Sequence, residues 1–141
     1  MRRWHYLLIF MVACASSGGT TSLVGIVDSP QKFAGQPVSV HGYLAPLGGR
    51  PSMTLYLTRE HAQTHDVASS IAVFDPTSDE AVTRDCSNIH AVVVGTVARL
   101  PGSSRFSRDV LSFAISKVTR VVKVEPETGD SHICWQASPD A

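Results

Sequence analysis

The hydrophobic positions of residues 37–44 alternate with polar ones. Val38, Val40 and Leu44 share one phase, and the opposite phase carries polar or aromatic residues. Because successive side chains of a strand point to opposite faces, this pattern predicts a strand with one face against the core. Gly42 falls on that inward face, where the missing side chain permits a sharp bend or a bulge.

Four further segments are predicted to be strands. Residues 53–58 alternate cleanly, residues 70–74 form a short apolar run, and residues 89–97 are rich in β-branched side chains. The near-continuous apolar character of residues 89–97 predicts burial on both faces or a crossing between layers. In the last strand, residues 110–124, the apolar phase switches near residues 116–117, as a β-bulge would make it do.

Turns and one short helix separate these strands. Residues 46–51 and 101–104 are rich in glycine and proline, which predicts turns. Thr77 and Glu80 have the spacing of a capping box, so a short helix is predicted to follow the third strand. The polar residues 59–67 have room for a further helical turn.

The order of three strands, a short helix and two strands resembles the OB-fold, a five-stranded, partly open Greek-key barrel. Residues 33–44 (FAGQPVSVHGYL) and 92–97 (VVVGTV) carry the resemblance, and the first is similar to the opening strand of OB-like domains in exported bacterial proteins. The expected fold class is all-β with a minor α component, a small OB-like barrel over residues 23–125 with its helix between strands three and four. A different small barrel or a sandwich is the alternative.

The first residues have the pattern of an export signal. Arg2 and Arg3 supply a positive start, and residues 7–12 (LLIFMV) form a short apolar stretch. This stretch is too short to cross a bilayer, which takes about 20 residues. It leads into residues 11–14 (MVAC), which resemble the lipobox of bacterial lipoproteins.

That resemblance implies that residues 1–13 are a signal peptide and that Cys14 is acylated, which anchors the mature protein to a membrane. Residues 14–22 are then the acylated cysteine and a flexible tether of small residues. In a Gram-negative host, Ala15 resembles the default for sorting to the outer membrane, facing the periplasm. The alternative is a conventional signal peptide cut after Ala15, because residues 13–15 also fit an A-x-A site.

With Cys14 acylated, Cys86 and Cys134 are the two remaining cysteines of an exported domain. Two such thiols usually pair in an oxidising compartment, so a disulfide is predicted, with two free thiols as the alternative. In an OB topology the start of strand four lies near the end of strand five. The bridge would therefore hold the C-terminal tail, residues 126–141, over that end of the barrel.

Charge and motifs narrow the function. Without residues 1–13 the chain has 10 basic and 12 acidic residues, so it lacks the basic surplus on which nucleic-acid binding depends. No nucleic-acid partner is expected. The sequence contains no Walker loop, G-x-S-x-G elbow, H-E-x-x-H or G-x-G-x-x-G. We therefore predict no catalytic residues and no cofactor.

His61 and His65 are four residues apart, so on a helix they would share a face and could hold a metal. No third ligand is evident nearby, and the polar residues between them indicate solvated surface, so no metal site is predicted. This region and the loop of residues 45–53 are where an alternative function, a hydrolase of envelope polymers, would have its site.

Tyr43, Tyr56 and Phe74 lie on the first three predicted strands and form a candidate binding face. OB-folds take ligands on the outer face of these strands, often by stacking on aromatic rings. The alternative is that the rings only cover the barrel or pack under a terminal segment. The anchor, the fold and the missing catalytic motifs together predict a non-enzymatic binding module of the cell envelope. Its expected partners are the membrane, through the lipid, and another envelope protein, a peptide or a glycan.

Overall fold

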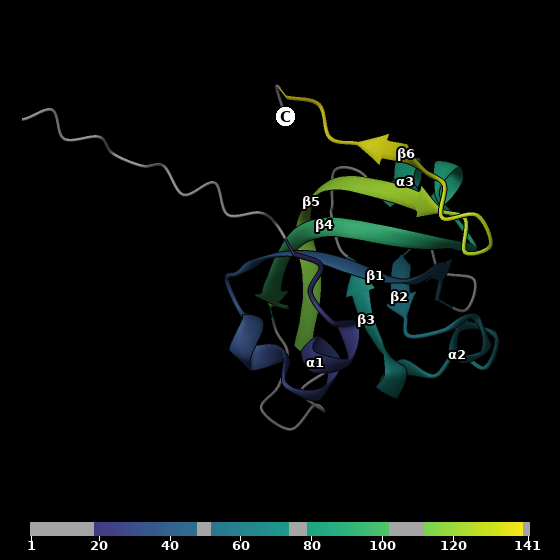
Figure 1. Ribbon diagram of the computed structural model, residues 1–141. Helices are drawn as coiled ribbons and strands as arrows, with labels where there is room; N and C mark the ends of the chain where they lie inside the picture. Colours follow the sequence, from purple (N-terminus) through teal and green to yellow (C-terminus); the bar gives the residue numbers. More distant parts are fainter. Residues whose placement is uncertain (1–18, 48–51, 74–78, 102–111, 140–141) are drawn as a thin grey trace, which may run out of the picture.

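A computed structural model describes residues 19–47, 52–73, 79–101 and 112–139 of the protein. Figure 1 shows a sheet that curls around one core, with short helices at its ends. The strands are β1 (Pro37–Pro46), β2 (Met53–Tyr56), β3 (Ser70–Val73), β4 (Ile89–Arg99), β5 (Phe113–Val124) and β6 (Ser131–Gln136). The helices are α1 (Leu23–Asp28), η1 (Pro30–Phe33), α2 (Arg59–Gln63), η2 (Val67–Ser69) and α3 (Asp79–Asp85).

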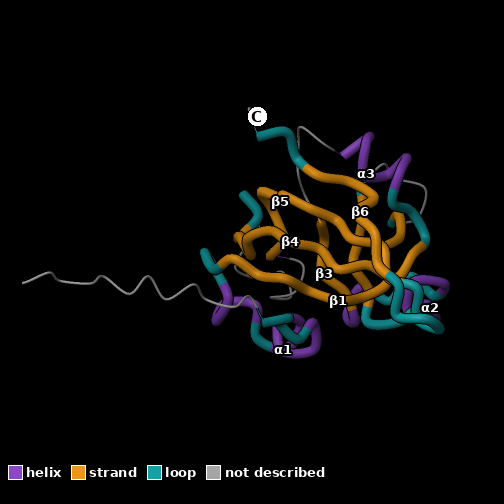
Figure 2. Tube along the Cα trace, turned by 45° about the horizontal axis from the view of Figure 1, so that its top comes forward, coloured by secondary structure: helices purple, strands orange, loops and turns teal. Residues whose placement is uncertain are grey.

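The strand pairing confirms the predicted OB-like barrel. The sheet has the order β3-β2-β1-β4-β5-β6, and β3 also pairs in parallel with β5, which closes the first five strands into a barrel. The helix α3 lies between β3 and β4, as the sequence predicts. Figure 2 shows the strands wrapped around the centre, with α1, α2 and α3 outside them. Thr77, half of the predicted capping box, lies outside the described residues.

The alternation along β1 is confirmed by burial. Val38, Val40 and Leu44 are all buried in the main core cluster. A Cβ atom on Gly42 would lie 2.7 Å from the backbone oxygen of Tyr56, which is closer than real Cβ contacts come. Glycine at this position therefore lets β2 pass close to β1 where the barrel bends.

The predicted bulge in the last strand is also confirmed. Val94 of β4 is opposite Arg120, whereas Thr96 is opposite Ser116, so β5 has extra residues between these two pairs. Lys117, one of the extra residues, has a φ of 47°, in the left-handed region. The switch in the apolar pattern of the sequence near residues 116–117 therefore corresponds to a change in the register between β4 and β5.

The prediction that β4 is buried on both faces is wrong for its outer face. Along the strand, fully buried residues alternate with half-buried ones such as Val92. Val92 lies opposite Val122 of β5, which in turn lies opposite Ile133 of β6, and Ile133 is 51% exposed. The outer β-branched side chains of β4, β5 and β6 pack against their cross-strand neighbours. This packing half-buries them without a further layer of structure on top.

The C-terminal tail contains a sixth strand that the sequence did not predict. β6 pairs antiparallel with β5, and the predicted disulfide between Cys86 and Cys134 is present, with 5.8 Å between the two Cα atoms. The register of this pair shifts between Val121 and Val122, so Cys134 is the extra residue of a bulge. The bulge lets Cys134 face the end of α3, where Cys86 is fully buried.

The end of the predicted tether is attached to the barrel. The backbone N–H of Thr21 donates a hydrogen bond of 2.7 Å to the carbonyl of Ser39, and the Ser22 side chain caps α1. Cys14 and the predicted signal peptide lie outside the described residues. Among the helices that are described, none is long and apolar enough to cross a membrane.

The disulfide should contribute strongly to stability. Replacing both partners (Cys86→Ala with Cys134→Ala) should lower the free energy of unfolding by about 4 kcal/mol, because the bridge closes a long loop with a separation of 48 residues. Urea denaturation under non-reducing conditions measures this loss, with Cys14→Ala as the matched control that leaves the bridge intact. An unchanged midpoint in the double variant would contradict the role assigned to the bridge.

Candidate binding site

An open depression of about 560 Å³ lies where the end of β1 meets α2. β1 contributes Tyr43, Ala45 and Pro46 to its lining, and α2 contributes Arg59, Ala62 and Gln63. His65 and Asn88, from the segments after α2 and before β4, complete it. Its volume is in the range of small-molecule sites, which is roughly 300–1,000 Å³.

The helix α2 begins at a capping residue, and one small residue packs it against the barrel. Thr58 precedes the helix, and its hydroxyl accepts a hydrogen bond from the backbone N–H of His61. Ala62, only 7% exposed, packs against Tyr43 and Tyr56 in a second core cluster outside the barrel. This packing leaves the longer side chains of α2 at the rim of the depression.

Two residues of the lining have left-handed backbone conformations. His65 has a φ of 51° and Asn88 a φ of 55°. For a residue other than glycine such a conformation costs roughly 1 kcal/mol or more, so the surrounding structure must hold it in place. At His65 it reverses the chain directly after α2, and at Asn88 it turns the chain into β4. These two turns bring side chains from distant parts of the sequence to one depression.

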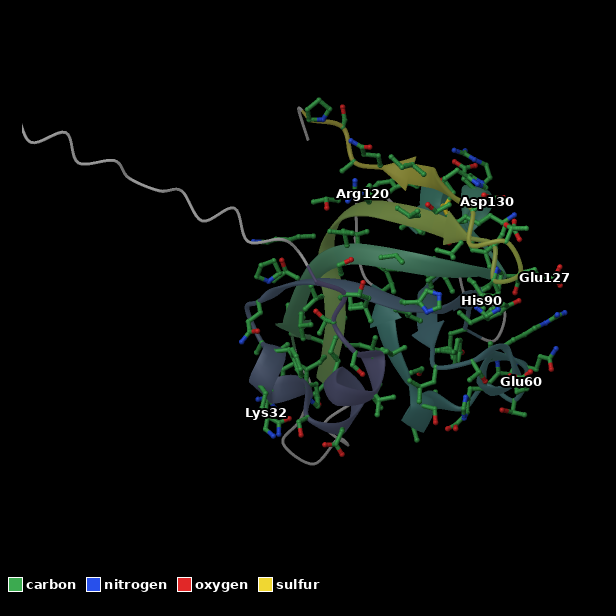
Figure 3. The ribbon with its side chains drawn as sticks, viewed as in Figure 1. Lys32, Glu60, His90, Arg120, Glu127 and Asp130 are labelled. Carbon is green, nitrogen blue, oxygen red and sulfur yellow. A yellow bond between two sulfur atoms is a disulfide. The ribbon has the colours of Figure 1, made fainter. Side chains whose placement is uncertain are left out.

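The tyrosines of the predicted binding face are buried beside the depression and do not form an exposed surface. Tyr43 and Tyr56 are opposite each other on β1 and β2, and they are 8% and 0% exposed. The ring of Tyr43 also meets His90 edge-on, with 5.2 Å between ring centroids, and Figure 3 shows His90 on the outer face of β4. The two tyrosines cover the outside of the barrel and pack against Ala62 of α2, not under a terminal segment. Phe74 lies outside the described residues.

The hydroxyl group of Tyr56 is buried and makes no hydrogen bond within the described structure. Burial raises the pKa of Tyr56, and the nearby side chain of Thr54 offsets part of this increase. The ring thus contributes apolar packing beneath the depression, while its polar atom is left without a good partner.

His61 and His65 do not share a helix face, because α2 ends at Gln63. His61 Nδ1 lies 2.9 Å from Thr58 Oγ1, and His61 Nε2 lies 3.9 Å from Asp66 Oδ2. Asp66 accepts hydrogen bonds from the side chain of Ser69 and from the backbone of Ala68, and the Ser69 bond is the main reason that the pKa of Asp66 is lowered. Within the described ranges, no three histidine, cysteine or acidic side chains are grouped to hold a metal ion.

The chemistry of the depression follows from its rim. Arg59 is the one permanently charged side chain of the described lining, Gln63 and Asn88 supply amide groups, and His65 supplies an imidazole ring. The lining residues that the structure describes include no carboxylate. A site with this composition suits a small polar ligand that is neutral or anionic. Neither Arg59 nor Asn88 was predicted from the sequence to belong to a binding site. For Asn88 the sequence does contain one indication, because it lies in the turn directly before the β-branched run of β4.

Comparison with protein-family models finds no match, and comparison with curated proteins finds none either.

Removing the buried hydroxyl should stabilise the protein. Tyr56→Phe should raise the free energy of unfolding by roughly 1 kcal/mol, because a buried polar group without a partner costs about 1–3 kcal/mol. Tyr43→Phe, in the same cluster, is the matched control and should change stability less. Denaturant titration compares the two variants, and a clear loss of stability in Tyr56→Phe would show that the hydroxyl makes a hydrogen bond that matters.

Proposed function

We propose that the protein is a membrane-anchored lipoprotein of the bacterial cell envelope and that its barrel is a non-enzymatic binding module. The depression over β1 and α2 is its ligand site in this proposal. The observation that carries it is a depression of about 560 Å³ with a cationic and hydrogen-bonding rim, on a barrel whose interior is filled.

The filled interior supports a site on the outside of the barrel. Leu44, Leu55, Val93 and Val121 are all fully buried at the centre of the main cluster. Small barrels have an interior just wide enough for side chains, so a ligand has no room inside this one. The outer depression is a feature of the described surface with room for a small ligand.

The anchor in this proposal is Cys14, and the chain places the barrel close to it. Seven peptide units separate Cys14 from Thr21, which is fixed to β1. Fully extended, this stretch reaches about 25 Å at most. An acylated protein would therefore hold the part of the barrel at Thr21 within this distance of the membrane surface, where ligands of the cell envelope are concentrated.

The alternative is an envelope-polymer hydrolase with a site near residues 45–53 or at His61 and His65. One observation favours it: Thr58, His61 and Asp66 are arranged in the order of nucleophile, base and carboxylate. However, Thr58 caps α2 and Asp66 caps η2, so both side chains already have structural roles. None of the three lines the depression. The arrangement therefore supports binding better than hydrolysis.

The lipid anchor can be tested directly in the host. The native chain should incorporate labelled palmitate and fractionate with membranes, whereas Cys14→Ser should do neither, because the acceptor thiol is gone. Ser16→Ala, two residues away, is the control that keeps the cysteine and should behave like the native chain. Equal labelling of the native chain and Cys14→Ser, or no labelling of either, would contradict the anchor.

A further inference from the structure

We infer that the depression binds an acidic saccharide, with the guanidinium of Arg59 on the carboxylate and the side-chain amides of Gln63 and Asn88 on hydroxyl or acetamido groups. This inference rests on the proposed binding function and names the chemical class of the ligand.

The charge of the rim selects an anion. Arg59 is exposed, and within the described part of the chain its guanidinium makes no hydrogen bond or ion pair. A guanidinium presents a planar fork of donors that matches a carboxylate in a bidentate pair. The described lining contains no acidic side chain, and the exposed carboxylate of the neighbouring Glu60, which interacts with the charge of Arg59, lies outside it.

The neutral groups of the rim select a ligand that both donates and accepts hydrogen bonds. Gln63 and Asn88 are exposed, and each amide offers two donors and one acceptor oxygen. Sugar hydroxyls and acetamido groups also combine donors with acceptors. The left-handed backbone of Asn88 turns the chain into β4 beside the depression, where its exposed amide is part of the lining.

The floor favours a sugar ring over a nucleotide. Nucleobases bind proteins largely by stacking on aromatic faces, but Tyr43 and Tyr56 are almost fully covered. The lining offers instead a small apolar surface of Ala45, Ala62 and Pro46, to which Tyr43 adds only the small part of its ring that is exposed. Such a surface suits the C–H face of a pyranose ring.

The strands at the depression also disfavour a peptide. A peptide that adds to a sheet needs an open strand edge. Tyr43 is paired on one side with Tyr56 of β2 and on the other with His90 of β4. Beyond it only Ala45 and Pro46 lack a β4 partner, and Pro46 has no N–H to donate, so the open edge is too short to add a peptide strand. A saccharide, which is recognised by side chains, does not need one.

The test uses two sugars that differ by one carboxylate-bearing group. The purified, acylated protein in detergent is titrated by calorimetry with N-acetylmuramic acid and with N-acetylglucosamine, which lacks the lactyl carboxylate. The acid should bind about tenfold more tightly, because it adds one charge-assisted bidentate contact. Arg59→Gln should abolish this difference.

Two further variants separate recognition from folding. Arg120→Gln removes an exposed arginine on β5, away from the depression, and should keep the full preference for the acid. Asn88→Asp should weaken binding of the acid more than that of the neutral sugar, because it adds a negative charge to the rim. The thermal midpoints of all variants show that each one is folded.

Any outcome that differs from these expected results overturns the inference. Equal affinity for the two sugars, or a preference that survives Arg59→Gln, would show that the carboxylate is not recognised here. A tripeptide with a free carboxyl end that binds through Arg59 more tightly than either sugar would replace the saccharide with a peptide and leave the proposed binding function standing. If no probe binds, the saccharide is wrong, while palmitate labelling still decides the anchor independently.

Discussion

The parallel pairing of β3 with β5 is the constraint on which the rest of the structure depends. Only two residue pairs make it, Ala72 with Ala114 and Val73 with Ile115, yet it converts an open sheet into a closed barrel. Closure by five strands leaves an interior that side chains fill completely, so any ligand must be bound outside. It also brings strands so close together that Gly42 has no room for a side chain.

The parallel pairing of β5 with β3 is short, and this determines where β6 can pair with β5. β5 pairs with β3 only near its start, and β6 takes the same edge of β5 further along, where the disulfide fixes it to the end of α3. The strand β2 is buried on both faces because α2 covers its outside. The depression lies at the border of that covered area, so the same packing that buries Tyr56 also builds the candidate site.

The sequence predicted those elements whose pattern is set by the barrel core. β1 was predictable because in its first half Val38 and Val40 lie in the core while Pro37 and His41 are exposed, and the bulge of β5 because its apolar phase switches. β6 was not, because its inner side consists of little more than Cys134 and Trp135 and depends on the disulfide. The site was harder to predict than the strands. The helix α2 ends at Gln63 and the chain takes a left-handed turn at His65, so His61 and His65 do not lie on one face of a helix.

The central claim is that a filled barrel binds its ligand in the outer depression between β1 and α2. Chemical-shift mapping of the backbone and side-chain amides during a titration with N-acetylmuramic acid tests it most directly. The account predicts shifts confined to the end of β1, to α2 and to His65 and Asn88. Shifts that instead cluster on the outer face of β4 to β6, around Val92 and Ile133, or in the core at Val93, would contradict it.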